Sequence, residues 1–264
     1  MPQPSATKPL GSPFIELQSV DSTNNYAFKQ IHAGLAQHGM TVFAHEQLAG
    51  KGQRGKVWTV EKHANIIMSV LMKPGLLLPT QQFWLSACAA LAACDFFKSY
   101  AGNETNIKWP NDLYWQDRKA GGVLIESIVG SSELSDVNAQ TTKDNWKWAI
   151  VGIGININQT TFPIELQNPV SLKQITGKDF DVISLAKELC QKLNNYFEQL
   201  ITTGFENIYT QYSSHLYKRN EKVKLKHGNR IFEATIKGVS RTGKLIVHHA
   251  IEEEFDFGEV ELVM

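Results

Sequence analysis

Apolar residues recur at spacings of three and four positions in several stretches, a pattern that predicts helices. Between residues 81 and 100 they nearly encircle the helix axis, which predicts a helix buried within the core. Between residues 181 and 203 they form a single stripe that ends at Gly204, as expected for an amphipathic helix. A shorter helix is expected from Phe205 to His215.

A further helix is expected near the N-terminus. Asp21 or Ser22 can cap its start, and Gly39 is expected to end it. Capping alone is one explanation for the polar run Ser22-Thr23-Asn24. The alternative is that these small polar groups also bind a carbonyl or carboxylate of a ligand at the helix start.

Alternating and β-branched stretches predict strands between these helices. They are expected at residues 14–20, 40–46, 57–72 (as one or two strands), 123–129 and 146–157. Turns are expected at residues 109–112 and 116–122, on either side of one short strand. The polar residues 130–145 are expected to form a long hairpin insertion. Residues 162–178 are expected to be loop and turn.

The apolar period changes from about 3.6 to 2 at Glu221. Four or five short strands separated by turn residues follow in the last fifty residues or so, which predicts a small β-barrel. We therefore expect a disordered lead over residues 1–13, a main domain over 14–217 and a small C-terminal domain over 218–264.

The composition is that of an ordinary globular protein. The chain has 264 residues, of which 42% are hydrophobic and 20% charged. Lys+Arg and Asp+Glu both number 26, so no overall field favours nucleic acid or an anionic membrane. The three cysteines form no C-x-x-C pair, which indicates a reducing cytoplasm rather than disulfides or zinc. No apolar run approaches the ~18 residues of a membrane span, and the N-terminal lead lacks a secretory h-region.

One stretch, Gly50–Trp58, concentrates glycines and cations. Its glycines are Gly50, Gly52 and Gly55, and its cations are Lys51, Arg54 and Lys56. Glycine lets backbone N–H groups come close to a ligand, and the cations supply charge for an anion such as phosphate. Taken alone, a mobile basic surface loop explains the stretch equally well.

Three phosphate-loop patterns fit Gly50–Trp58 in part, and its context excludes each. A Walker loop needs Ser or Thr where Val57 stands. Both that pattern and a dinucleotide-binding G-x-G-x-x-G also need a helix directly after the loop, whereas strand residues follow here. The kinase pattern is excluded because Asp256-Phe257-Gly258 lies six residues from the C-terminus and no H-R-D-x-x-x-x-N is present.

Two further groups of residues are candidates for chemistry. Lys108 and Lys119 flank the short strand expected between the two turns; either could be a solvated turn lysine, but two together are unusual. Gly152 and Gly154 weaken a strand interior and indicate that a ligand or another backbone packs closely there. Asn156 follows the same alternation and is expected to share their face.

The order of five motifs resembles the biotin protein ligases. They are Asp21-Ser22-Thr23-Asn24, Glu46–Gly55, Lys108-Trp109-Pro110-Asn111-Asp112, Arg118–Glu126 and Gly152-Ile153-Gly154-Ile155-Asn156. The match spans residues 18–158 and continues more weakly into the small C-terminal barrel. Since the catalytic domain is expected to start near Phe14, the resemblance is to the short, ligase-only type without an N-terminal DNA-binding domain.

The resemblance implies an α+β fold, with a mixed-sheet catalytic domain like that of class II aminoacyl-tRNA synthetases followed by an SH3-like barrel. It implies that biotin and ATP, with Mg²⁺, form biotinyl-5′-AMP and pyrophosphate. A lysine of a biotin carboxyl carrier domain then takes the biotinyl group and AMP leaves. The carrier is the partner that we expect, with no nucleic acid or membrane partner, for a monomer or homodimer.

The resemblance also assigns residues. Lys119 would be catalytic, bridging the biotin carboxylate and the α-phosphate. Biotin would be bound by Ser22, Thr23, Asn24, Gln47, Lys51, Gly52, Gln53, Lys119 and Gly122. The nucleotide would be bound by Gly50, Arg54, Lys56, Trp58, Lys108, Asn111 and Asn156, and Asp112 would contact Mg²⁺ unless it only forms the turn.

Gln53 departs from the family pattern, because many members have arginine there and that arginine is associated with holding the adenylate. Arg54 or Lys56 could take over its phosphate contact. Two other functions stay open: a lipoate–protein ligase, which shares the fold and the adenylation chemistry, and a non-catalytic biotin-sensing regulator. The loop Gly50–Gly55 and Lys108–Asp112 favour biotin over lipoate, and Lys119 argues against a regulator.

Overall fold

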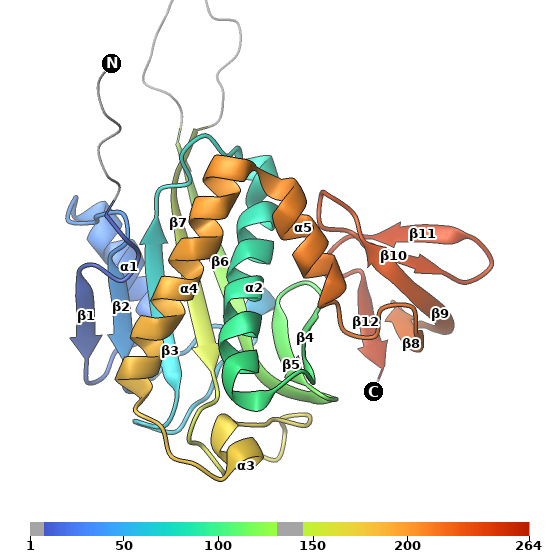
Figure 1. Cartoon of the computed structure of the whole chain (residues 1–264), viewed down its shortest axis with the longest axis horizontal. Helices are drawn as coiled ribbons and strands as arrows, with labels where there is room; N and C mark the ends of the chain where they lie inside the picture. The colour runs from blue at the N-terminus through green and yellow to red at the C-terminus, as the bar shows by residue number, and fades with distance from the viewer. Residues whose placement is uncertain (1–7, 131–144, 264) are drawn as a thin grey trace, which may run out of the picture.

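A seven-stranded mixed sheet forms the centre of the computed structural model, which describes residues 8–130 and 145–263 (Figure 1). Its strand order is β1-β2-β3-β7-β6-β5-β4, and β1 and β2 are parallel while the other neighbours are antiparallel. The strands are β1 (Phe14–Leu17), β2 (Thr41–Ala44), β3 (Ile66–Met72), β4 (Thr105–Lys108), β5 (Asp112–Trp115), β6 (Arg118–Gly130) and β7 (Asn145–Ile155). The long strands β6 and β7 form the centre of the sheet, and they pair from Gly121 to Gly130 over the whole length of β7.

Helices cover the sheet on both faces. On one face α2 (Gln82–Ala101) packs against α4 (Val182–Thr203) and α5 (Phe205–Ser214), in front of the sheet in Figure 1. On the other face α1 (Thr23–His32) contacts β2, β3 and β7 over a smaller core. The alternation of β3 fits this arrangement, because Met68 and Val70 enter the large core and Leu71 enters the small one.

The structure confirms that α2 is buried, and small residues allow its close packing. Most of its interior positions are Ala or Cys, and all are nearly inaccessible, so α4 and α5 can approach it closely. Cys88, Cys94 and Cys190 are buried free thiols. Burial raises the pKa of Cys94 to about 12 and that of Cys190 to about 11, which disfavours the thiolate form of both side chains.

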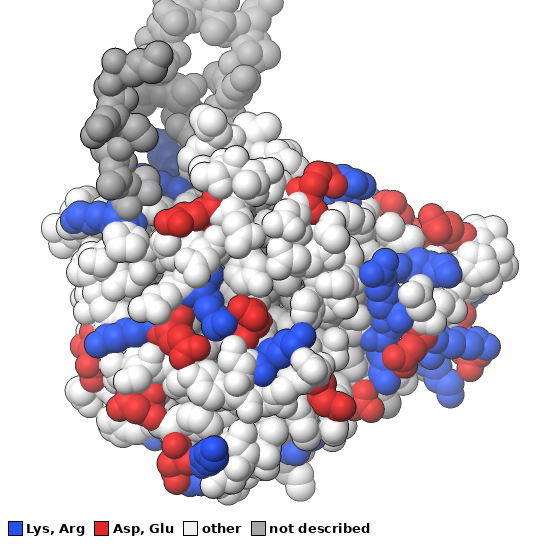
Figure 2. All heavy atoms as spheres, viewed as in Figure 1, with Lys and Arg blue, Asp and Glu red and all other residues white. Residues whose placement is uncertain are grey.

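A second, five-stranded antiparallel sheet follows, in the order β11-β10-β9-β8-β12, and it confirms the α+β fold with an SH3-like C-terminal barrel. Its strands are β8 (Lys222–His227), β9 (Arg230–Val239), β10 (Leu245–His248), β11 (Glu252–Phe255) and β12 (Val260–Val263). Lys222, Lys224 and Lys226 alternate along β8 with inward apolar residues. Lys and Arg side chains are accordingly dense over this sheet, whereas both signs mix elsewhere on the same view (Figure 2).

The structure corrects two predictions about the N-terminal helix. The helix ends at His32 and not at Gly39, and a loop follows it. Ser22 is its N-cap residue, but the Ser22 side chain makes no capping hydrogen bond within the described residues. The Asp21 carboxylate instead accepts a hydrogen bond from Asn25 at 3.0 Å, which lowers the pKa of Asp21.

Three other boundaries differ from expectation. The stretch 57–72 holds a single strand that begins at Ile66, and before it Val57 makes an isolated bridge to Lys51. Residues 118–122 are not a turn but the start of β6, which pairs with β5 between Arg118 and Gly122 and with β7 from Gly121 onward. A short helix, α3 (Leu172–Thr176), lies in the segment expected to be loop, where Ser171 caps it.

Two predicted segments lie partly outside the described residues. The expected N-terminal lead falls there over residues 1–7, and the expected hairpin insertion over residues 131–144. At the described ends of the insertion, Gly130 pairs with Asn145, so β6 and β7 form an antiparallel hairpin. Among the helices of the described residues, none is long and apolar enough to cross a membrane.

Candidate active site

A cavity of 910 Å³ lies between the central sheet, the glycine loop (residues 50–58) and the C-terminal sheet. Its size suits a nucleotide together with a small acid. The structure brings all the predicted site residues except Gly50 to its wall: Ser22, Thr23, Asn24, Gln47, Lys51, Gly52, Gln53, Arg54, Lys56, Trp58, Lys108, Asn111, Asp112, Lys119, Gly122 and Asn156. Gly50 lines a smaller pocket beside the loop.

Buried polar groups at the start of α1 form one end of the cavity. Gln47 Oε1 accepts hydrogen bonds from the backbone N–H of Thr23 at 2.8 Å and from the Thr23 hydroxyl at 3.1 Å. The Ser69 hydroxyl lies 2.7 Å from Thr23 Oγ1 and 2.5 Å from Asn24 Oδ1. Thr23, Asn24 and Ser69 are nearly inaccessible and Gln47 is half-buried, so a polar group of a ligand bound here would exchange hydrogen bonds with fixed partners.

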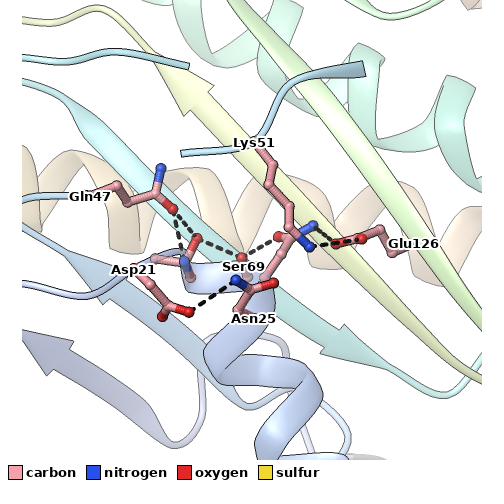
Figure 3. Close-up of polar contacts among 8 residues, drawn as sticks. Asp21, Asn25, Gln47, Lys51, Ser69 and Glu126 are labelled. Carbon is pink, nitrogen blue, oxygen red and sulfur yellow. Dashed lines mark hydrogen bonds and ion pairs between the residues drawn. The ribbon is translucent and has the colours of Figure 1, made fainter. Parts of the chain in front are cut away.

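The same network reaches the glycine loop. Asn24 Nδ2 donates to Glu126 at 2.6 Å, and the other carboxylate oxygen of Glu126 lies 3.3 Å from the ammonium of Lys51. Figure 3 shows Lys51 and Glu126 facing each other beside Ser69, with Gln47 at the opposite side. Gln47 and Lys51 lie at the two ends of the segment that leads into the glycine loop, so the network anchors this segment at both ends.

Two glycines of β7 make room for this arrangement, as the sequence predicts. A Cβ atom on Gly152 would collide with Asn24 Oδ1. A Cβ atom on Gly154 would lie 2.6 Å from Cε2 of Trp58, closer than carbon atoms can approach. Any side chain at Gly152 would therefore displace Asn24, and any side chain at Gly154 would displace the Trp58 indole at the cavity wall.

The glycine loop folds back on itself without an α-helix after it, as its context predicts. Trp58 N donates to Gly50 O at 2.9 Å, and Gly52 N donates to Lys56 O at 2.6 Å. Between them Gln53–Gly55 form a single 3₁₀ turn, in which Arg54 has a left-handed φ of 55°. The Arg54 guanidinium donates to Gly258 O of the C-terminal sheet at 2.7 Å, so the loop spans the two sheets.

Two lysines enter the cavity from β4 and β6, the strands on either side of β5. The Lys119 ammonium lies 2.7 Å from Asp112 Oδ2 and 5.9 Å from the centre of the Trp58 ring. The Lys108 ammonium donates to the Tyr114 hydroxyl at 3.1 Å and lies 4.8 Å from that ring's centre. Burial lowers the pKa of Lys108. The two cations make this part of the cavity suited to phosphate and carboxylate groups.

Asn111 and Asn156 line the cavity, and the amide nitrogen of each side chain donates to a backbone carbonyl. Asn111 Nδ2 donates to Val123 O, while Asn111 Oδ1 is buried without a hydrogen-bond partner among the described residues. Asn156 Nδ2 donates to Val170 O at 3.1 Å. The Oδ1 atom of Asn111 is thus a buried acceptor that the described residues leave unsatisfied.

Asp112 is the predicted Mg²⁺ contact, and this role stays a prediction. Within the described residues, no group of three or more His, Cys, Asp or Glu side chains could hold a metal ion by itself. Mg²⁺ in nucleotide sites is bound by one or two carboxylates together with the phosphates of the substrate. Asp112, whose carboxylate lies at the cavity wall, fits that pattern.

Several residues at the site escaped the sequence prediction. Ser69 is one of them. Its lone hydroxyl in an otherwise apolar strand was the signal that could have identified it. The C-terminal sheet supplies part of the wall through Phe257, Gly258 and Glu261. Trp109 connects the central sheet to the C-terminal sheet, because its Nε1 atom donates to Gly243 O at 2.8 Å and its ring packs edge-on against Phe257.

Comparison with known proteins shows which proteins share this sequence and fold. Residues 16–137 match the model of the biotin/lipoate A/B protein ligase family. The biotin–[acetyl-CoA-carboxylase] ligase of Paracoccus denitrificans is 28% identical over 239 residues, which cover 88% of this chain and 92% of that protein. The bifunctional ligase/repressor BirA of Bacillus subtilis is 28% identical over 245 residues, which cover 91% of this chain and 71% of that protein.

Among solved structures, the biotin protein ligase from Aquifex aeolicus in complex with biotin and ATP superposes with a TM-score of 0.77. It is 25% identical, and the match covers 96% of this chain and 99% of that one. The mixed sheet, flanking helices and C-terminal barrel therefore define an α+β ligase of this fold. Residues 16–137 are a domain of the biotin/lipoate A/B protein ligase family, and the chain is a homologue of the biotin protein ligases.

Proposed function

We propose that this protein is a biotin–protein ligase. In the first step an oxygen of the biotin carboxylate attacks the α-phosphorus of ATP, forming biotinyl-5′-AMP and releasing pyrophosphate. In the second step the amine of a carrier lysine attacks the acyl carbon, forming an amide and releasing AMP and a proton. The observation that carries the proposal is the single cavity in which buried amide and hydroxyl groups lie next to two lysines.

The comparisons support this substrate pair. The Aquifex aeolicus relative, similar over nearly its whole length, was solved with biotin and ATP. A Leishmania major biotin protein ligase solved with biotinyl-5-AMP shares the fold with a TM-score of 0.56. The Paracoccus denitrificans relative is named for transfer to acetyl-CoA carboxylase, which supports a carrier domain of a biotin-dependent carboxylase as the partner here.

The polar end of the cavity suits the ureido ring of biotin. Ser22, Thr23 and Gln47 would hydrogen-bond this compact donor and acceptor set, with Asn24 beside them. The apolar part of biotin would lie against Gly122 and the wall formed by Ile67 and Ile153. Lys51, Gly52 and Gln53 would close over the ligand from the loop.

The lysines suit the reacting groups. The first step joins two anions, so cations must offset their repulsion and the charge that develops on the α-phosphate. Lys119 would bridge the biotin carboxylate and that phosphate, leaving Asp112 as the group that orients it. Gly50, Arg54, Lys56, Trp58, Lys108, Asn111 and Asn156 would surround the nucleotide. Mg²⁺, when bound to ATP with Asp112 at its side, would supply further charge neutralisation.

A transfer assay tests the proposal. The protein is incubated with biotin, ATP, Mg²⁺ and an apo carrier domain, and the carrier is weighed by mass spectrometry. We expect a gain of one biotinyl group on one lysine and no gain when ATP is omitted. A gain with lipoate but not with biotin would assign the chain to the lipoate branch of the family. Biotin binding without pyrophosphate release or transfer would instead indicate a non-catalytic regulator.

A further inference from the structure

Glu126 places a carboxylate in an apolar row of β6. Leu124, Glu126 and Ile128 alternate along one face of this strand, where Leu124 lines the cavity and Ile128 packs against the small core under α1. Glu126 itself lines the smaller pocket beside the glycine loop. Its carboxylate contacts two residues of the main cavity wall, Asn24 and Lys51. Through these two residues Glu126 can influence a ligand in the main cavity.

Both neighbours of the Glu126 carboxylate are donors. Asn24 Oδ1 accepts from the Ser69 hydroxyl at 2.5 Å, so the Nδ2 group of the same amide is turned to donate to Glu126 Oε2 at 2.6 Å. The Lys51 ammonium donates to the other oxygen, Glu126 Oε1, at 3.3 Å (Figure 3). A carboxylate has two acceptor oxygens, whereas a glutamine amide has one oxygen and an NH₂ group that only donates. A glutamate can therefore serve both neighbours, and a glutamine of the same length cannot.

The contact with Lys51 joins the glycine loop to the central sheet. Within the described residues, the backbone hydrogen bonds of residues 50–58 join parts of the loop to one another. The hydrogen bonds from the loop to the rest of the described protein come from two side chains, from Lys51 to Glu126 and from Arg54 to Gly258 O. The first leads to the central sheet and the second to the C-terminal sheet. The position of the loop relative to the central sheet therefore depends on Glu126.

We propose that Glu126 is a positioning residue, which holds Asn24 at the polar end of the cavity with one oxygen and Lys51 of the glycine loop with the other. This inference rests on the proposed function, in which the ureido ring of biotin lies at the polar end and the loop closes over it. The two contacts differ in their access to water. Asn24 is 4% exposed, whereas the Lys51 side chain is 40% exposed and can turn to solvent. Losing the Asn24 contact should therefore weaken binding more than losing the Lys51 contact, which should mainly loosen the loop.

A pair of variants of similar length separates the two contacts. Glu126→Gln keeps one acceptor, which the buried Asn24 amide retains while Lys51 turns to solvent, and Glu126→Met removes both acceptors. Hydrogen exchange of residues 50–58 without ligand, followed by mass spectrometry, measures loop opening, and calorimetry measures the Kd of biotin. We expect loop exchange to be about three- to fivefold faster in both variants, since both lose the ion pair. Biotin should bind at most about fivefold more weakly to Glu126→Gln, but about 10- to 100-fold more weakly to Glu126→Met, which leaves the buried Asn24 donor unpaired.

Further variants complete the test. Lys51→Met breaks the same contact as Glu126→Gln, so the double variant should show loop exchange no faster than either single variant. Glu198→Met removes a similar contact on α4, where Asn194 Nδ2 donates to Glu198 at 2.8 Å, and should change neither readout. Glu126→Ala replaces Glu126→Met if that variant unfolds.

Three outcomes would each overturn the inference. They are unchanged loop exchange in both Glu126 variants, additive effects of Lys51→Met and Glu126→Gln on that exchange, and equal losses of biotin affinity in Glu126→Gln and Glu126→Met. A wild type that binds no biotin would refute the proposed function, and the loop exchange would still decide whether Glu126 holds Lys51.

Discussion

The Lys119 ammonium lies 2.7 Å from Asp112 Oδ2 at the wall of the cavity. The two side chains are 33% and 31% exposed, so water screens the pair, and its contribution to stability is at most about 1 kcal/mol. The backbone of Lys119 is held independently, because its N–H donates to Asn168 O at 2.8 Å and its carbonyl accepts from Val170 N at 2.9 Å. The pair thus orients a cation toward the cavity more than it stabilises the fold.

Replacing Lys119 should therefore affect chemistry far more than stability. We expect Lys119→Ala to slow pyrophosphate release from biotin and ATP by about 100- to 1000-fold, because the charge developing on the α-phosphate loses its cation. Thermal unfolding should shift little. Lys173→Ala, which breaks an ion pair of similar length with Asp179 on the surface, is the matched control and should leave the rate unchanged. Adenylate formation within tenfold of wild type in Lys119→Ala would refute its assigned role.

Lys108 should make nucleotide binding sensitive to alkaline pH. Burial lowers the pKa of Lys108 below the ordinary 10.5, and nearby Lys119 and Lys56 act in the same direction while Asp112 opposes them. The ammonium is present below its pKa and lost above it, so affinity for the adenylate anion should fall as pH rises toward that value. Titration of biotinyl-5′-AMP binding from about pH 7 to pH 10 measures this fall.

Lys108→Arg provides the comparison for the pH profile. Its guanidinium stays charged throughout this range, so the part of the fall that belongs to Lys108 should disappear in the variant. The same profile in the variant and the wild type would show that Lys108 does not carry the effect.

Gly154 should be intolerant of even one methyl group. In Gly154→Ala the new carbon would lie 2.6 Å from Cε2 of Trp58, and the indole, which belongs to a loop, would move more readily than the central strand. We expect adenylate binding to weaken by about tenfold or more while the melting temperature changes little. Gly238→Ala in the C-terminal sheet meets open space and serves as the control. Unchanged affinity in Gly154→Ala would mean that Trp58 does not cover the ligand.

Local patterns predict most of the fold because each element follows its own period. Gly152 and Gly154 of β7 also predicted a close approach, since they leave two successive positions on one face of the strand without a side chain. The start of β6 was mistaken for a turn because Gly121 and Gly122 are typical of turns. In the sheet their lack of side chains has another use: a Cβ on Gly121 would lie 2.6 Å from Gly154 O.

The rest of the site depends on contacts between residues far apart in sequence. Gly258 meets Arg54 and Trp109 meets Gly243, and neither pair has a local signature. Ser69 contacts Thr23 and Asn24 only because β3 lies beside α1. The role of a hydroxyl within a strand is set by such tertiary neighbours, which periodicity does not identify.

Gln53 is the position at which adding a charge should improve retention of the adenylate. It is half-buried at the cavity wall, whereas the guanidinium of Arg54 donates to Gly258 O. An arginine at position 53 would add a cation facing the phosphate, so we expect Gln53→Arg to release biotinyl-5′-AMP about two- to fivefold more slowly. Release is measured by chasing labelled adenylate with unlabelled ligand. Gln53→Met, of similar size and without charge, should not slow release, and faster release from Gln53→Arg would contradict the prediction.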